Sequence, residues 1–478
     1  MILNKILRVK QDSILNLLSN RLVRKFFVSF KIYLYFRLGM YKTVSEIAYK
    51  GNNFYTNFAK AISFSAIGNR EMANYYIANL LDKYKNRKKK QKEKLSRMLN
   101  PYYPELSLSI LENVGVKDTR YFSLLLALDK EIKIKTQEIR IPEDWLFYLN
   151  LYNTQSSIPL PVKQLEYLNG FLNDYQLEKM QLINQKRELN VFNLTCVCRK
   201  IYSENLPLVS ILVTTFNSQE SIEYCLKSLL LQTYSNIEVI VIDDNSTDNT
   251  LEIIIDFMRE DKRIKLISLP YNIGTFSAKN IGLQYVKGEF VTCQDSDDYA
   301  HPRKIEEQII PLLEDNNIIC TVSDWIRLDN KGNAYSRFIY PIMRHNPASL
   351  MFRKEIVLNN IGYWDYVRIG ADSEFYERLK LFFGSKSVKK IRKPLTFGAH
   401  RENSLMTSKD TGYDSNGLSN IRLEYWEAWR KWHIHCCKNK QLLKISGGLS
   451  HRPFSVPKEI EVDLNLVKKS IKELKLYY

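Results

Sequence analysis

Short runs of apolar, mostly β-branched residues recur along the chain after residue 208. Within each run, apolar residues occupy neighbouring positions as well as alternate ones, so both faces of the expected strand are apolar. This pattern is typical of strands in a parallel sheet that helices cover on both faces. The expected strands are Val209–Thr214, Ile237–Ile242, Ile264–Leu269, Glu289–Cys293 and Ile318–Ser323.

Segments with helical spacing separate these strands. Gln219–Leu231 and Asp248–Arg259 each place apolar residues three and four positions apart. Strand and helix therefore alternate, which predicts an α/β fold class with a doubly wound sheet. In sheets of this kind, ligands bind beyond the carboxyl ends of the strands. The residues that follow each strand are therefore candidates for a functional site.

The first 200 residues have mainly helical spacing. Residues 43–85 predict two antiparallel helices joined at Gly68-Asn69, weakly similar to a tetratricopeptide repeat but without a clear second copy. We therefore predict four parts along the chain. They are an all-α, strongly basic N-terminal domain at 1–135, a helical connector at 136–204, the α/β domain at 205–435 and a partly helical tail at 436–478.

The composition is that of a soluble globular protein, with 45% hydrophobic and 26% charged residues in a chain of 478. No apolar run approaches the ~20 residues that a membrane-spanning helix needs. The first residues lack the apolar core of a signal peptide, so we expect a cytoplasmic location. The seven cysteines include no Cys-x-x-Cys pair, which favours reduced thiols over a zinc site or a disulfide framework.

Positive charge is concentrated in the N-terminal part of the chain. Residues 1–100 hold 21 Lys and Arg against 5 Asp and Glu, a net charge of +16 out of +18 for the whole chain. Attraction to an anionic membrane surface is worth about 1 kcal/mol for each basic residue close to it. A solvated helical surface explains the charge equally well. No nucleic-acid-binding motif accompanies the charge, so a nucleic-acid partner is disfavoured.

The segment after the first strand, Thr214–Asn217, contains no glycine. Dinucleotide-binding dehydrogenases and P-loop enzymes use glycine there to bring the backbone close to phosphate. Both classes are therefore disfavoured. Nucleotidyltransferases that make sugar nucleotides also use a glycine-rich loop in this place, so they are disfavoured as well.

Carboxylates follow two of the expected strands. Asp243 and Asp244 end the second strand, where they can accept hydrogen bonds from a nucleotide base and a ribose. Asp295, Asp297 and Asp298 follow the fourth strand, and these acids repel one another unless a cation joins them. Mg²⁺ or Mn²⁺ suits such oxygen ligands. A helix cap and a solvated acidic turn are the structural alternatives.

These motifs resemble glycosyltransferase family 2, which has the GT-A fold with a mixed, doubly wound α/β sheet. The resemblance is specific over 207–300, which includes VSILVTTFN, VIDDNSTDNT and CQDSDDYA, and it continues more weakly to about residue 435. It is of the bacterial surface-polysaccharide type, here with an N-terminal helical extension. The resemblance implies that Asp243 contacts the nucleotide base, that Asp295 lies near the ribose and that Asp297 binds the metal. The other donor-site residues that it implies are Thr215, Asn217, Glu220, Asp244 and Lys279, the last as a point charge for the diphosphate.

A second acidic motif, at Gly370–Phe375, matches the place of the family's catalytic base. The resemblance implies that Asp372 is this base, which needs to lie within hydrogen-bond reach of the acceptor hydroxyl. The Glu that usually precedes it is Ala371 here, which leaves Glu374 as a competing candidate. An acid at the start of a helix is the structural alternative for Asp372. His400 is a candidate metal ligand or, alternatively, a structural histidine.

The resemblance implies an inverting glycosyltransferase that uses Mn²⁺ or Mg²⁺. It would move a sugar from a nucleotide-diphosphate donor, a UDP-sugar by preference, to a hydroxyl of a glycan or a lipid-linked acceptor in capsule or lipopolysaccharide synthesis. The enzyme would work in the cytoplasm, or peripherally at the cytoplasmic face of the inner membrane through residues 1–100. The alternative is a catalytically inactive GT-A domain that serves as a binding scaffold.

Overall fold

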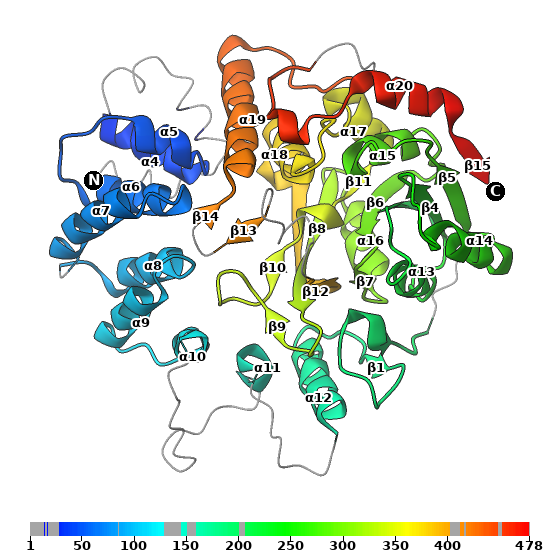
Figure 1. Cartoon of the computed structure of the whole chain (residues 1–478), viewed down its shortest axis with the longest axis horizontal. Coiled ribbons are helices and arrows are strands. Elements are labelled where there is room, and N and C mark those ends of the chain that lie inside the picture. Colours follow the sequence, from blue (N-terminus) through cyan, green and yellow to red (C-terminus); the bar gives the residue numbers. More distant parts are fainter. Residues whose placement is uncertain are drawn as a thin grey trace.

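The computed structural model describes residues 14, 17, 28–84, 86–128, 145–150, 159–199, 206–401, 412–414, 417–447 and 452–477. Within these ranges, a group of N-terminal helices lies beside a large α/β unit, and the connector helices α11 and α12 lie along the lower edge of the view (Figure 1). The domain boundaries predicted at 135/136 and 204/205 lie outside the described residues.

The N-terminal part is helical, as predicted. Its described helices are α4 (Val28–Arg37), α5 (Tyr41–Glu46), α6 (Phe54–Ala66), α7 (Arg70–Asp82), α8 (Lys89–Leu99), α9 (Pro104–Asn113) and α10 (Thr119–Ala127). The expected antiparallel pair is α6 and α7, which pack through apolar residues such as Ile62 and Ile77. Gly68 adopts a positive φ of 79° in the turn, and the Asn69 side chain accepts a hydrogen bond from the Met72 amide at 3.0 Å. The Asn69 side chain therefore caps α7.

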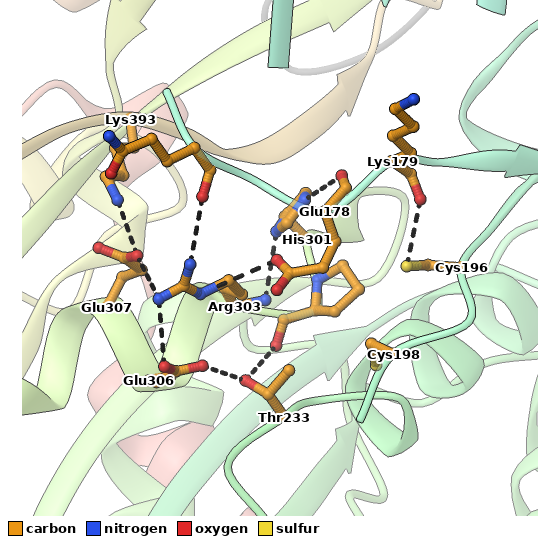
Figure 2. Close-up of polar contacts among 12 residues, drawn as sticks. Glu178, Lys179, Cys196, Cys198, Thr233, His301, Arg303, Glu306, Glu307 and Lys393 are labelled. Atoms are coloured by element: carbon orange, nitrogen blue, oxygen red, sulfur yellow. Dashed lines mark hydrogen bonds and ion pairs between the residues drawn. The ribbon is translucent and has the colours of Figure 1, made fainter. Parts of the chain in front are cut away.

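The connector comprises α11 (Leu146–Leu149), α12 (Leu160–Asn173) and a hairpin of β1 (Gln181–Leu182) with β2 (Leu194–Thr195). A polar cluster fastens it to the start of α16 (Lys304–Glu314), as Figure 2 shows. The Arg303 guanidinium lies 3.8 Å from the Glu178 carboxylate and 3.0 Å from the Glu307 carboxylate. His301 Nε2 donates to the Glu178 carbonyl at 3.1 Å. The connector thus packs directly on the α/β unit.

One mixed sheet forms the centre of the α/β unit. Its strands follow the order β15, β5, β4, β3, β6, β11, β8, β12, β7, and β9 and β10 also pair with β8. The neighbours β5, β4, β3 and β6 are parallel, whereas β11 is antiparallel to both β6 and β8. The strand bounds are β3 Val209–Thr215, β4 Ile237–Asp243, β5 Ile264–Ser268, β6 Phe290–Asp295, β7 Tyr299–Ala300, β8 Cys320–Leu328, β9 Ala334–Tyr335, β10 Arg344–His345, β11 Met351–Arg353, β12 Val388–Ala399 and β15 Lys475–Tyr477. The predicted α/β class, with a mixed sheet behind an all-α N-terminal part, is confirmed.

Helices cover both faces of the sheet, as the apolar strand pattern predicts. Leu212 and Ile242 pack in one core with α15 (Thr275–Gly282), α17 (Lys354–Ile361) and α18 (Ala371–Phe383). Ile211 and Val241 point to the opposite core, which α13 (Ile222–Leu230), α14 (Thr250–Glu260) and α16 complete. Alternate strand residues therefore fill different cores, and the sheet is buried on both sides.

The C-terminal segment packs as part of the α/β unit. The boundary predicted at 435 falls inside α19 (Asn420–Asn439), and α20 (Leu464–Glu473) follows. The last strand, β15, pairs antiparallel with β5 at the edge of the sheet. A short pair of strands, β13 (Tyr413–Asp414) and β14 (Gly417–Leu418), precedes α19. No helix within the described ranges is long and apolar enough to cross a membrane.

Candidate functional site

The carboxyl ends of three parallel strands meet at one edge of the sheet. Thr215 at the end of β3 pairs with Asp243 at the end of β4, and Thr214 pairs with Asp295 at the end of β6. This register brings residues that are far apart in the sequence to adjacent strand ends. The edge is therefore the ligand-binding position that the topology predicts.

The loop after β3 is anchored to the loop after β4. Asn217 has a positive φ of 47°, and its side-chain oxygen accepts a hydrogen bond from the Thr247 amide at 2.8 Å. Its own amide donates to Ser246 Oγ at 2.9 Å. Thr215 is buried, and its hydroxyl has no hydrogen-bond partner among the described residues. Asn217 thus shapes the loop, while the Thr215 hydroxyl is ready to meet a ligand.

Two other side chains of this loop face solvent. Glu220, which the resemblance places near the nucleotide, is exposed just before α13. Phe216 is 48% exposed although it directly follows the buried Thr215. An exposed aromatic ring at a strand end can stack on a nucleotide base. The sequence reasoning did not single out Phe216. Its position as an aromatic residue in the loop after the first strand could have identified it as a candidate.

The neighbours Asp243 and Asp244 have different environments. The Asp244 carboxylate accepts backbone hydrogen bonds from Ile273 and Gly274, both at 2.8 Å, at the entry to α15. Burial raises the pKa of Asp244 to about 7. Asp243 is also buried, and both of its oxygens lie 3.3 Å from the Ser246 amide. Asp244 therefore holds the start of α15, whereas Asp243 keeps acceptor capacity for a ligand.

The acids after β6 lie over a buried lysine. The Lys304 ammonium donates to the Cys293 carbonyl at 3.0 Å and to Gln294 Oε1 at 2.6 Å. Burial lowers the pKa of Lys304 to about 8, and the charges of Asp295 and Asp298 oppose this shift. The positive charge of Lys304 thus offsets part of the negative charge of Asp295 and Asp298. The sequence reasoning missed it, because a lysine at the start of a helix is usually solvated.

Burial separates the members of this acid group. Asp298 is buried, and its Oδ1 accepts a hydrogen bond from the Ala399 amide of β12 at 3.3 Å. Burial, followed by repulsion from Asp297 and Asp295, raises the pKa of Asp298 well above its usual range. The side chains of Asp295 and Asp297 are 40% and 25% exposed. Asp295 and Asp297 are therefore the accessible carboxylates.

Lys279 interacts electrostatically with two other predicted site residues, Asp295 and Asp372. Its ammonium lies 3.4 Å from Asp295 Oδ1, and its side chain is almost fully buried. Burial lowers the pKa of Lys279, but the charges of Asp295, Cys293 and Asp372 raise it, and the net shift is upward. The lysine therefore stays charged between an acid of β6 and an acid of α18. Positions 279, 295 and 372 come together only in the folded chain.

Asp372 and Glu374 lie in the first turn of α18 but differ in accessibility. Asp372 is half-buried; its Oδ1 accepts the Ser373 amide at 2.7 Å, and burial raises its pKa. Glu374 is fully buried and forms paired 2.9 Å hydrogen bonds with Arg378 and one of 3.0 Å with His433. Its carboxylate is engaged inside the protein. The structure therefore does not support Glu374 as the alternative base.

Asp297 and His400 lie near the end of β12. Asp297 Oδ2 forms an ion pair of 2.5 Å with the Arg401 guanidinium. The His400 ring stacks on Tyr335 with ring centroids 3.6 Å apart, and burial lowers its pKa. Across the described ranges, no group of three His, Cys, Asp or Glu side chains is arranged to hold a metal ion. The stack on Tyr335 and the lowered pKa both favour a neutral His400 ring.

The comparison with protein families agrees with this geometry. Residues 210–373 match the model described as "Glycosyl transferase family 2". This segment begins in β3 and ends one residue after Asp372. The chain carries a family 2 glycosyltransferase domain.

Individual relatives match the same part of the chain. A protein of Haemophilus influenzae described as an uncharacterized glycosyltransferase is 40% identical over 129 residues, which are 27% of this chain and 51% of the relative. The glucosyltransferase WfgD of Escherichia coli is 37% identical over 134 residues, covering 28% of this chain and 51% of that protein. This chain thus spans about half the length of these two relatives.

Solved structures also align with the chain. The crystal structure of S. aureus TarS residues 1–349 in complex with UDP-GlcNAc aligns over 41% of this chain and 59% of that one. Its sequence identity is 24% and its TM-score is 0.34.

Two accessible carboxylates of this domain could bind a divalent cation such as Mg²⁺ or Mn²⁺. Mg²⁺ is usually held by one or two carboxylates together with substrate phosphates and water, without an all-protein cage. Asp297, with Asp295 two residues away, supplies such a donor set, and the cation of Arg401 already balances Asp297. The residues present therefore fit a cation site that a diphosphate completes.

Proposed function

We propose that this chain is an inverting glycosyltransferase. In this proposal it moves a sugar from a nucleotide-diphosphate donor, preferably a UDP-sugar, to a hydroxyl of a glycan or a lipid-linked acceptor. The observation that carries the proposal is the convergence of Asp295, Lys279 and Asp372 at the carboxyl edge of a family 2 domain. An acid for the donor side, a buried ammonium and a carboxylate for the acceptor hydroxyl would thus lie at one edge of the sheet.

The donor would bind across the ends of β3, β4 and β6. Asp243 would accept a hydrogen bond from the base, and Thr215 and Phe216 would line the same pocket. The Lys279 ammonium would move from Asp295 to the diphosphate, where it acts as a point charge. Asn217 and Asp244 would shape the pocket, since their oxygens already accept backbone hydrogen bonds.

The reaction would be a single displacement, which inverts the anomeric carbon. Asp372 would accept the proton of the acceptor hydroxyl while that oxygen attacks the sugar. Burial raises the pKa of Asp372, which makes it a stronger base than an exposed aspartate. Asp297, with Asp295, would hold Mn²⁺ or Mg²⁺, a Lewis acid that stabilises charge on the departing diphosphate. His400, stacked on Tyr335, would take no part in holding the cation.

The relatives support a role in polysaccharide assembly. WfgD carries the description of a UDP-Glc transferase acting on α-D-GlcNAc-diphosphoundecaprenol, and a Pasteurella multocida chondroitin synthase is 37% identical over 115 residues. We extend this to the present chain as synthesis of a surface glycan such as capsule or lipopolysaccharide. Such an acceptor would be met at the cytoplasmic face of the inner membrane. The exposed lysines at the start of α8, Lys88, Lys89 and Lys90, are suited to an anionic lipid surface.

A donor screen tests the proposal. The purified protein is incubated with common UDP-, GDP- and dTDP-sugars in Mn²⁺ or Mg²⁺, and release of the nucleoside diphosphate is measured with and without excess chelator. We expect cation-dependent hydrolysis of one donor class, and its loss in Asp372→Asn. Donor binding with no hydrolysis under any condition would favour the inactive scaffold. The absence of both would refute the proposal.

A further inference from the structure

A group of basic side chains lies beside α18, where β10 and β12 flank β8. We call it the α18–β12 basic cluster, and its members are Arg344, His345, Lys380, Lys390 and Arg392. Three of them, His345, Lys380 and Lys390, contact the ring of Tyr376, and Arg392 pairs with Asp324. The His345 ring centroid lies 4.9 Å from that of Tyr376, and the ammonium groups of Lys380 and Lys390 lie 5.0 Å and 5.9 Å from it. α18 and β12 thus direct two cations to this ring, and β10 adds a histidine.

The cluster contains more positive than negative charge. Glu377 is shared between Lys380 at 2.8 Å and Arg430 at 3.2 Å. Asp324 lies 3.4 Å from Arg392, whose side chain is 64% exposed. One carboxylate is thus divided between two cations, and the other lies at the long end of the range for an ion pair. The acids nearby do not neutralise the cluster.

Lys390 forms no close ion pair with the described residues, and Glu377 and Asp324 act on it only from a distance. No carboxylate of the described ranges lies within 4.0 Å of its ammonium, although its residue is exposed to solvent. Burial of part of the side chain, followed by repulsion from Lys380 and Arg392, lowers the pKa of Lys390. A cation that its neighbours repel gains free energy when an anion arrives.

His345 adds an unused hydrogen-bond donor to the cluster. Both of its ring nitrogens are buried, and neither has a hydrogen-bond partner within the part of the chain that the structure describes. Burial, followed by the charges of Lys390 and Arg392, lowers its pKa to about 4, so the ring is neutral at pH 7 and still carries one N–H. A buried donor without a partner costs free energy, and a bound ligand would recover it.

Helix geometry connects this cluster to the proposed base. Asp372, Tyr376 and Lys380 are spaced four residues apart along α18, so they lie on one side of the helix. A helix rises 1.5 Å per residue, which places Lys380 ~12 Å from Asp372 along the axis. The cluster therefore lies along the helix that carries the base, away from the β6 acids that face the donor.

From these contacts we infer that the α18–β12 basic cluster binds an anionic group of the acceptor, a phosphate or a carboxylate. The group would lie ~12 Å from the hydroxyl that attacks the donor, a distance set by the rise of α18. Lys390 and Arg392 would supply charge-assisted hydrogen bonds, and the His345 N–H a neutral one. This inference rests on the proposed function, because it assigns an acceptor to the same site.

Binding of small anionic saccharides tests the inference without requiring turnover. The full-length protein, with UDP and Mg²⁺ in excess to fill the donor site, is titrated calorimetrically with maltotriose 1-phosphate, trigalacturonate or neutral maltotriose. The test variant is Lys390→Gln/Arg392→Gln. The matched control is Lys386→Gln/Lys389→Gln, which removes the same charge from exposed residues next to the cluster. Lys389 points to the opposite face of β12 from Lys390, because strand side chains alternate.

We expect the test variant to weaken binding of a charged probe at least ~10-fold, and the control variant to change it less than ~2-fold. Whichever charged probe binds more tightly identifies the group as phosphate or carboxylate. Equal losses in both variants, an unchanged test variant, or no preference of the wild type for charged over neutral probes would overturn the inference. Donor hydrolysis in the same samples reports separately on the proposed function.

Discussion

The carboxylate of Glu427 in α19 caps the first turn of α5 through Thr43. The Thr43 amide lies 3.0 Å and 3.1 Å from the two oxygens of Glu427, and its hydroxyl donates to Oε2 at 2.5 Å. The Lys42 amide donates to Oε1 at 2.6 Å. The two residues are 384 positions apart in the sequence. A buried carboxylate at the start of α5 therefore fastens the N-terminal helices to the α/β unit.

Loss of this cap should destabilise the protein. Glu427→Ala leaves backbone donors of α5 without partners, so we expect the free energy of unfolding to fall by about 1–3 kcal/mol. Urea unfolding followed by tryptophan fluorescence measures the change. Glu424→Ala is the matched control, because its ion pair with Lys42 is about half exposed on both sides. That control should cost less than ~1 kcal/mol. Equal losses in the two variants would show that Glu427 is not the fastening residue.

The two acids in the first turn of α18 should respond differently to substitution. Asp372→Asn should lower turnover at least ~10²-fold while donor binding and the melting temperature stay close to wild type, because only the proton acceptor is removed. Glu374→Gln should mainly lower stability, since it disturbs a fully buried pair with Arg378. Turnover assays and thermal melts on both variants separate these outcomes. Normal turnover in Asp372→Asn would remove Asp372 from the mechanism.

The cation site should depend on Asp297. We expect Asp297→Ala to abolish turnover, because the variant lacks a carboxylate that would hold the cation. In the wild type this carboxylate pairs with Arg401. Asp256→Ala is a control at an exposed acid of α14 and should retain activity. Melting curves of both variants should match the wild type within a few degrees. Full turnover of the wild type in excess chelator would contradict the cation requirement.

His301 should make stability depend on pH. Its pKa is lowered to about 4 by burial, whereas the unfolded chain has the ordinary value of about 6.5. As pH falls from 6.5 towards 4, the unfolded state binds a proton that the folded state does not, so stability decreases in this window. Urea unfolding at pH 7.5 and pH 5 measures the difference. In His301→Gln this difference should be smaller than in the wild type, and an equal difference would contradict the assignment.

The basic surface of α8 should direct the protein to anionic membranes. Lys89→Glu/Lys90→Glu should reduce sedimentation with anionic vesicles at 0.1 M salt, where the Debye length is ~10 Å. The same change at Lys438 and Lys440, exposed residues at the end of α19, is the control. Binding of the wild type should weaken at high salt. Equal binding to neutral vesicles would identify this surface as a solvated face without a lipid role. Point variants are preferable to removal of residues 1–100, which would expose Glu427.

The sequence by itself determined where the strands β3, β4, β5, β6 and β8 lie along the chain. It also identified the acids at the ends of β4 and β6 as candidate site residues. Strand periodicity and the order of elements are properties of nearby residues, so they can be read along the chain. The apolar runs also predicted correctly that both sheet faces are covered. Asp243 and Asp295 were singled out in this way, because each follows an apolar run, whereas Asp372 was singled out through the resemblance to glycosyltransferase family 2.

Only the tertiary structure decided which acids are accessible. Asp244 is occupied by amides 29 and 30 residues away, and Glu374 by His433, 59 residues away. Lys304 beneath the acid group became visible only once α16 was packed against β6, and the C-terminal segment became part of the sheet only through β15. A carboxylate has the same chemistry in every local sequence. Whether it binds a ligand or holds a helix depends on the distant groups that folding brings within 3 Å, and burial makes those contacts strong.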